Sequence, residues 1–326
     1  MRVPAIFPGQ AVSYIARRCC QEMSPVRPVL TLGLAGALLA AGIAGSAQKP
    51  LPQPKRPAYG LPNLAMHEIT DVSVAPLYTP LGERLPGRWG LRFTATLDNV
   101  GRGHFLVYGS RERAGEPCSP VDEAGNQCEA VEMQAEQRVI EADGTVTSYP
   151  DLGSLFFHAP HNHWHLRSVE RFFIATMAGK SVTTDAKTGF CLGDRLYYTL
   201  DRPPNYPGLR NDLQNCEPGS GDPQTDGRRK LSVFEGISSG WSDDYPSYTS
   251  DGEPLEGQQL EITDLPAGAY RLVNVANPDG VYRETTRRDN AASVLFRLTW
   301  PGGSRPSVEV RASCVRTQRC TRKRAL

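Results

Sequence analysis

Alternation of apolar and polar residues dominates the chain from residue 61 onward. Every second residue from Trp89 to Leu97 is apolar or small, and this run ends at a turn-forming segment, residues 98–101. Side chains two positions apart on a strand share one face, so the run predicts a half-buried strand. The same pattern predicts strands in His104–Tyr108, Gln137–Thr147 (a hairpin around Asp143-Gly144), Glu170–Thr184 (two strands around Ala178-Gly179), Gln259–Ile262, Tyr270–Ala276 and Ala291–Trp300.

No stretch of this part of the chain has a long helical period. The 31 glycines and 27 prolines supply frequent turn residues between the short apolar runs. Many short strands joined by such turns are typical of antiparallel folds. We therefore expect a mainly β protein, an antiparallel β-sandwich-like single domain with long irregular loops and few helices. Residues 201–230 form the longest of these predicted loops, and we expect them to serve function because loops of this length are uncommon in compact domains.

The N-terminal part has a different pattern. An apolar run, Val29–Ala44, follows Arg27 and ends in the small residues Gly45-Ser46-Ala47. This order is typical of a secretory signal peptide, so residues 1–47 are expected to be removed after Ala47, and a single-pass anchor is the alternative. The prediction implies a secreted, periplasmic or extracellular protein with no stable membrane association after cleavage. Residues 48–60 are rich in proline and predict a flexible lead-in, residues 61–302 the folded domain, and residues 303–326 a basic tail containing Cys314 and Cys320.

Charge and cysteine content narrow the class of protein further. The formal net charge is +1, and loss of residues 1–47, with four arginines and one glutamate, lowers it by three to −2. A nearly neutral chain does not favour a nucleic-acid partner. Six cysteines then remain, which favours three disulfides in an exported protein. Pairing of nearest neighbours predicts Cys118–Cys128, Cys191–Cys216 and Cys314–Cys320, although the sequence permits other pairings and a thiolate metal site is the rival interpretation.

Four of the six histidines lie within one short segment, at His158, His161, His163 and His165. Imidazole is the commonest metal ligand in proteins, and three of these residues alternate. On a flat strand, the outer pair would lie about 13 Å apart, whereas a metal–nitrogen bond is about 2 Å long. The segment therefore predicts a metal site on a bent or bulged strand. All-imidazole ligation suits zinc, copper, iron or nickel, and the absence of an acidic residue in the cluster leaves copper or zinc as the best candidates.

The order of motifs resembles the lysyl oxidase family, in particular its shorter bacterial members. The family's copper segment has the form His-x-x-His-x-His-x-His, and the chain has this pattern over His158–His165. The resemblance spans roughly Pro62 to Trp300. It implies that copper is held by His161, His163 and His165, with His158 beside these ligands.

Two further motifs of the family follow in the same order. Lys187 precedes Phe190-Cys191-Leu192, and Tyr245 ends the segment Gly240-Trp241-Ser242-Asp243-Asp244-Tyr245. In the family, the lysine and tyrosine at these positions form lysine tyrosylquinone, a cofactor made from the protein's own side chains. The resemblance thus implies a Lys187–Tyr245 quinone and a copper-dependent oxidation of primary amines, with peptidyl lysine as one option for the substrate. Molecular oxygen would be the second substrate, and an aldehyde, ammonia and hydrogen peroxide the products.

A carboxylate is the natural base for removing the proton next to the amine. Asp243 lies in the family motif and is the first candidate for this base, with Asp244 the second. Copper is favoured over zinc because formation of the quinone requires a redox-active ion.

Some members of the family also bind calcium. The corresponding positions in this chain are Asn63, Glu284, Asp289 and Asn290, all of which carry side-chain oxygens. Asn63 replaces a carboxylate of the family pattern, and Arg287 and Arg288 add positive charge nearby. Calcium prefers several oxygen ligands with net negative charge, so the alternative is a turn whose polar side chains satisfy the backbone.

Two other functions are compatible with the histidines alone. One is a non-catalytic extracellular β-sandwich that binds copper or zinc. The other is a zinc-dependent hydrolase, which is weaker because no glutamate or further histidine lies at a recognisable base position beside the cluster.

Overall fold

The computed structural model describes residues 59–79, 83–111, 132–150, 152–158, 163–184, 189–197, 231–248, 252, 254–255, 257–303 and 305–321. The chain divides after Lys49 into two units, and all of these residues belong to the second, Pro50–Leu326. Their regular elements are β-strands and one short 3-10 helix, η4 (Pro301–Gly303). The predicted mainly β fold is confirmed. None of the helices in these ranges has the length and hydropathy to cross a membrane.

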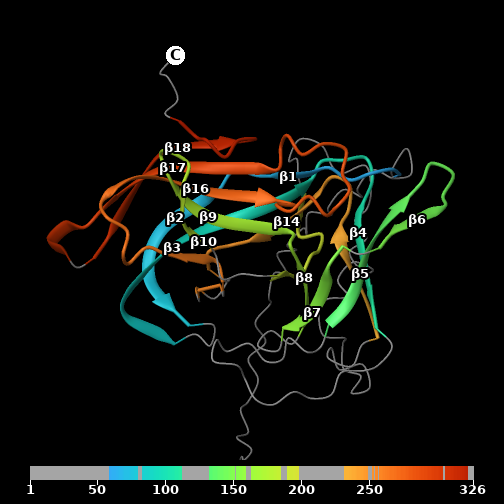
Figure 1. Cartoon of the computed structure of the whole chain (residues 1–326), viewed down its shortest axis with the longest axis horizontal. Helices are drawn as coiled ribbons and strands as arrows, with labels where there is room; N and C mark the ends of the chain where they lie inside the picture. The colour runs from blue at the N-terminus through green and yellow to red at the C-terminus, as the bar shows by residue number, and fades with distance from the viewer. Residues whose placement is uncertain are drawn as a thin grey trace, which may run out of the picture. The chain divides into compact units, whose positions relative to one another are not determined.

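The described strands form three antiparallel sheets (Figure 1). The six-stranded sheet has the order β1-β3-β14-β12, with β2 and β15 also paired to β3. Its strands are β1 (Leu64–Met66), β2 (Thr70–Tyr78), β3 (Arg84–Asn99), β12 (Leu196–Tyr197), β14 (Trp241–Tyr245) and β15 (Gln259–Glu261). The five-stranded sheet follows the order β10-β9-β16-β17-β18. Its strands are β9 (Glu170–Thr176), β10 (Ser181–Thr184), β16 (Gly268–Ala276), β17 (Ala291–Thr299) and β18 (Ser307–Val315).

The seven-stranded sheet carries the histidine segment. Its order is β11-β8-β7-β5-β4-β13, and β6 pairs with β5. Its strands are β4 (Phe105–Ser110), β5 (Glu132–Ile140), β6 (Val146–Tyr149), β7 (Ser154–His158), β8 (His163–Arg167), β11 (Gly189–Phe190) and β13 (Ser232–Ile237). The sheet ends at the two-residue strand β11, which pairs with β8.

Phe172 packs between aromatic residues of the other two sheets. Its ring lies edge-on to Phe93 of β3 at 5.0 Å and to Phe190 of β11 at 5.9 Å. Phe172 and Phe93 are fully buried, and the alternation of apolar residues along β3 explains why Phe93 faces this core. Edge-to-face packing of buried aromatic rings adds about 0.5–1.5 kcal/mol beyond the burial of their area. This cluster therefore links all three sheets and fixes the position of β11.

The strands predicted from alternation are all present, with ends that differ by a few residues. The predicted Cys314–Cys320 disulfide is also present. Cys191 is disulfide-bonded as well, but its partner lies outside the described residues, so the pairings with Cys216 and between Cys118 and Cys128 stay predictions.

The prediction of a basic tail after residue 302 is wrong for residues 307–315. Ser307–Val315 is strand β18, which pairs with β17 over its whole length, and Cys320 is fully buried. The folded domain therefore continues past residue 302. Apolar residues at positions 308, 310, 312 and 314 alternate with polar ones, and they explain why this charged segment forms a strand.

Candidate active site

The histidine segment forms a β-hairpin rather than one continuous strand. β7 ends at His158 and β8 begins at His163, and these two residues face each other in the pairing register. Residues 159–162, including the predicted ligand His161, lie outside the described residues. His158, His163 and His165 share one face of the hairpin with Phe156, while Trp164 is buried on the opposite face. In place of the predicted single bent or bulged strand, the described histidines thus lie on two paired strands.

Two of the described imidazoles are close enough to bind the same metal ion. The Nε2 atoms of His163 and His165 lie 2.8 Å apart, and the ring of His158 stacks on that of His165 at a centroid distance of 4.6 Å. Imidazole nitrogens that each bind one ion at about 2 Å lie about 3 Å apart. This spacing fits a copper or zinc ion. Among the described residues, no set of three His, Cys, Asp or Glu side chains forms a metal-binding group, so a third ligand would have to come from outside them.

Gly189 of β11 fits directly against His165. A Cβ atom at position 189 would lie 2.7 Å from the Cβ of His165 and would also collide with the ring of Phe156. Only a residue without a side chain allows β11 to approach the histidine hairpin this closely. Close packing against His165 and Phe156 therefore explains why the motif Gly189-Phe190-Cys191 begins with glycine.

The next two residues of the same segment contact Tyr245. The ring of Phe190 lies edge-on to that of Tyr245 at 5.0 Å, and the Tyr245 hydroxyl lies 3.0 Å from the carbonyl oxygen of Cys191. Tyr245 comes from β14, which belongs to a different sheet from β11. One short segment thus contacts both the histidine hairpin and the predicted quinone tyrosine.

Asp243 is hydrogen-bonded to Tyr245. The Tyr245 hydroxyl donates to Asp243 Oδ2 at 2.7 Å, and both residues point to the same face of β14 because they lie two positions apart. Asp243 is completely buried and Tyr245 is nearly so. Asp244 points to the other face and is half-buried. The geometry therefore favours Asp243 over Asp244 as the carboxylate beside the tyrosine.

Arg195 is the counterion of Asp243, and the sequence did not predict it. Its Nε donates to Asp243 Oδ1 at 2.7 Å. Its backbone N–H donates to the carbonyl oxygen of Ser242, because Arg195 directly precedes β12, which pairs with β14. Burial raises the pKa of Asp243 to about 6, although Arg195 and the Tyr245 hydroxyl act in the opposite direction. Burial, together with the nearby Asp243 charge, raises the pKa of Tyr245 well above its usual value.

Two buried carboxylates hold the segment between Cys191 and Arg195 in place. Glu235 accepts a hydrogen bond from the backbone N–H of Leu192 at 3.2 Å, and Asp194 accepts one from that of Ser238 at 2.7 Å. Charge-assisted hydrogen bonds of this kind are stronger than neutral ones. They fix the loop that carries the Cys191 carbonyl and Arg195 against β13 and the turn that precedes β14.

The predicted calcium positions also come together. Asn63 precedes β1, and its side-chain amide donates to Asp289 Oδ2 at 2.8 Å. The Oδ1 atoms of Asn63, Asp289 and Asn290 are buried and have no hydrogen-bond partner among the described residues. Glu284 Oε1 accepts from the side-chain amides of Asn277 and Asn290. Burial raises the pKa of Glu284 despite these hydrogen bonds.

Buried oxygen atoms without donors are costly unless a cation or water satisfies them. Three such atoms beside a carboxylate match the hard oxygen ligands that calcium prefers, so the residues fit this ion. Among the described residues, no ion pair joins Arg287 or Arg288 to a carboxylate of this cluster.

The remaining predicted site residues lie outside the described part of the chain. These are His161, Lys187 and the loop 201–230. No protein-family model matches this chain, and no curated protein is significantly similar to it.

Proposed function

We propose that this protein is a secreted copper-dependent amine oxidase that uses a quinone formed from Lys187 and Tyr245. The observation that carries the proposal is the position of residues 189–191. Gly189 packs on His165, while Phe190 and Cys191 contact Tyr245. Lys187 precedes Gly189 by two positions, so chain connectivity limits the distance between their Cα atoms to about 7 Å. Residues 189–191, which follow Lys187 closely in the sequence, thus contact both the histidine hairpin and Tyr245.

The proposed chemistry assigns separate tasks to the protein's residues. Copper would supply the redox capacity for making the quinone, and the quinone would supply the electrophilic carbonyl that oxidises the amine. Asp243 lies beside the Tyr245 hydroxyl and would accept the proton released from the carbon next to the amine nitrogen. Arg195 would keep the Asp243 carboxylate ionised and oriented. The Cys191 carbonyl and the Phe190 ring would hold the tyrosine ring in one orientation.

The experiment that tests this function measures copper content and amine-dependent hydrogen peroxide on the same samples. Copper-loaded wild-type protein is expected to release peroxide with at least one member of a panel of primary amines, including a lysine-containing peptide. His163→Ala and His165→Ala should lose both copper and peroxide release. His67→Gln, which changes a half-exposed histidine of the six-stranded sheet region, is the matched control and should keep both. A copper-loaded wild-type protein that yields no peroxide with any amine would contradict the proposal.

The second candidate is a non-catalytic copper- or zinc-binding protein. The close approach of the His163 and His165 nitrogens supports it, because it needs only the histidine hairpin. Metal binding with unmodified Lys187 and no peroxide release would favour this candidate. Secretion and calcium binding belong to the same proposal and do not distinguish the two functions.

A further inference from the structure

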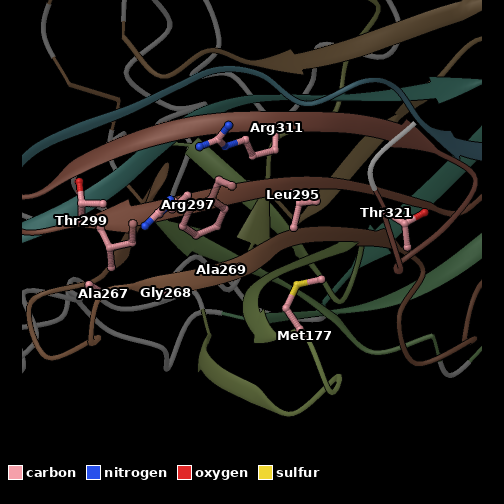
Figure 2. A pocket seen from close by; sticks show the side chains of 11 residues that line it. Met177, Ala267, Gly268, Ala269, Leu295, Arg297, Thr299, Arg311 and Thr321 are labelled. Atoms are coloured by element: carbon pink, nitrogen blue, oxygen red, sulfur yellow. The ribbon is translucent and has the colours of Figure 1, made fainter. Parts of the chain in front are cut away.

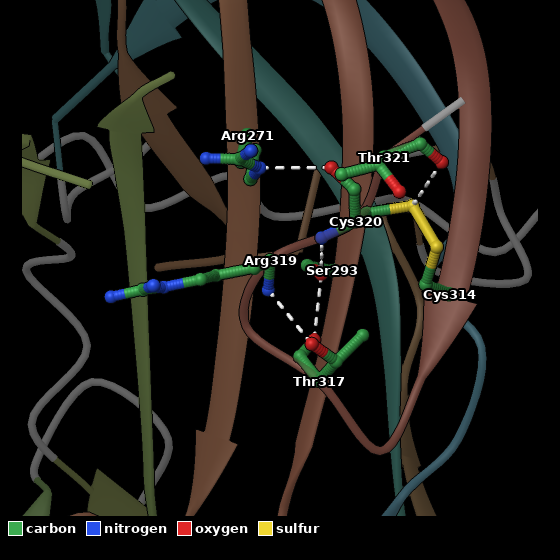
Figure 3. Close-up of a disulfide and its surroundings, with 7 residues drawn as sticks. All are labelled: Arg271, Ser293, Cys314, Thr317, Arg319, Cys320 and Thr321. Carbon is green, nitrogen blue, oxygen red and sulfur yellow. Dashed lines mark hydrogen bonds between the residues drawn. A yellow bond between two sulfur atoms is a disulfide. The ribbon is translucent and has the colours of Figure 1, made fainter. Parts of the chain in front are cut away.

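The outer face of the five-stranded sheet is covered at one end by the chain that follows β18. Ser293 of β17 donates through its hydroxyl to the carbonyl of Thr317 and accepts from the backbone N–H of Cys320. Arg271 of β16 donates to the carbonyl of Cys320 at 2.9 Å (Figure 3). The Cys314–Cys320 disulfide holds this returning segment to β18. The cover extends to Thr321, the last residue of the chain that the structure describes.

A groove of about 540 Å³ lies on the same face of the sheet, beside Thr321 (Figure 2). Its surface consists mainly of apolar or small residues, among them Leu295 of β17, Gly268 and Ala269 of β16, and Met177. The side chain of Met177 is 43% exposed, although it is apolar. A volume of this size is typical of sites for small organic ligands.

Two arginines line the same groove. Arg311 is the extra residue of a β-bulge, because Ala312 pairs with Leu295 and Val310 pairs with Phe296. Bulges often redirect a side chain, and Arg311 lines the groove from this position. The Arg297 side chain is exposed on the outer face, and no hydrogen bond or ion pair joins it to the side chain of another described residue. Arg311 is paired with Glu309 and retains further donors.

The position of the groove excludes one common mode of peptide binding. Its central strand, β17, pairs with β16 on one side and with β18 on the other. The backbone groups of β17 are therefore used within the sheet, and no peptide can add to it as a further strand. A ligand has to be recognised by side chains, which are apolar on the floor and cationic at Arg297 and Arg311.

We propose that this groove binds a small amphipathic carboxylate. Its carboxylate group pairs with Arg297 and Arg311, whose planar guanidinium groups suit this anion, and its hydrocarbon part lies on Leu295, Ala269 and Met177. The site is on a different sheet from Tyr245 and from the histidine hairpin. The proposal therefore stands independently of the amine oxidase function.

Isothermal titration of the purified protein with octanoate tests this site. Octanoate should bind, and 1-octanol, which has a similar chain without the charge, should bind at least about tenfold more weakly. Arg297→Gln should weaken octanoate binding by about tenfold or more, and Ala269→Phe should abolish it by filling the groove. Arg305→Gln is the matched control, because Arg305 is an exposed arginine near Trp89 that does not line the groove.

The fold of each variant is checked by its thermal unfolding, and Arg297→Gln keeps the test sharp if Ala269→Phe does not fold. Absence of octanoate binding at millimolar concentration would overturn the proposal. Equal affinities of wild type and Arg297→Gln, or of octanoate and octanol, would overturn it too. Binding of an acidic peptide to a protein that does not bind octanoate would assign the groove to a different ligand and would also overturn it.

Discussion

The hydroxyl of Tyr245 lies 3.0 Å from the carbonyl oxygen of Cys191, although 54 residues separate them in the chain. Cys191 follows β11, which ends the seven-stranded sheet at the histidine hairpin, whereas Tyr245 ends β14 of the six-stranded sheet. The contact therefore joins two sheets at the point where the predicted metal ligands lie.

Gly189→Ala should weaken copper binding without changing any proposed ligand. The added methyl group would displace His165 or Phe156, because the Cβ of His165 would lie only 2.7 Å away. Changes to groups that orient metal ligands lower affinity by about 10- to 100-fold. Competition with a chelator of known affinity measures the effect. Gly268→Ala is the control, since a Cβ there would make only ordinary contacts, the nearest at 3.4 Å. Unchanged copper affinity in Gly189→Ala would show that β11 does not constrain the histidines.

Asp243→Asn should lower amine-dependent peroxide formation by about 10²- to 10⁴-fold, the usual contribution of a general base. The wild-type rate should rise with increasing pH through an apparent pKa of about 6, because burial raises the pKa of Asp243 to that value and only the ionised carboxylate accepts a proton. Steady-state rates between pH 4.5 and 8 measure this. Asp244→Asn is the matched comparison. If Asp244→Asn loses the activity and Asp243→Asn keeps it, the assignment of the base is wrong.

Arg195→Gln should move the acidic limb of this pH profile to higher pH. Burial is the main cause that raises the Asp243 pKa, and the Arg195 charge opposes it. Without that charge, the carboxylate would ionise only at higher pH, so activity at pH 6 would fall more than activity at pH 8. Arg171→Gln removes an exposed arginine that pairs with Asp279 and should leave the profile unchanged. A shift of the acidic limb to lower pH would contradict the role of Arg195.

Calcium should raise the melting temperature of the protein through the cluster at Glu284. A ligand at a hundred times its dissociation constant stabilises the folded state by about 2.7 kcal/mol. Differential scanning fluorimetry with and without calcium measures the shift, and Glu284→Gln should remove it. Glu68→Gln changes an exposed glutamate near Asn63 in the chain and serves as the control. An equal calcium-dependent shift in Glu284→Gln would place any calcium site elsewhere.

The strands and the grouping of the histidines could be predicted because both depend on local patterns. Alternation along β3 places Phe93 and Leu97 in the core, and the spacing of His163 and His165 places them on one face. β18 was not predicted, because the basic residues in and after it favour a solvated tail, although its apolar residues alternate. Arg195 could not be predicted, since its pairing with Asp243 arises from the two-residue strand β12 beside β14. The role of Gly189 likewise depends on a contact between β11 and β8, which no local pattern indicates.

Lys187 and Tyr245 are proposed to form one cofactor. Peptide mass mapping after incubation of the purified protein with copper in air tests it most directly. We expect a cross-linked pair of peptides containing Lys187 and Tyr245, which is absent without copper and absent in Lys187→Arg. Recovery of both peptides unmodified from fully copper-loaded wild-type protein would contradict it.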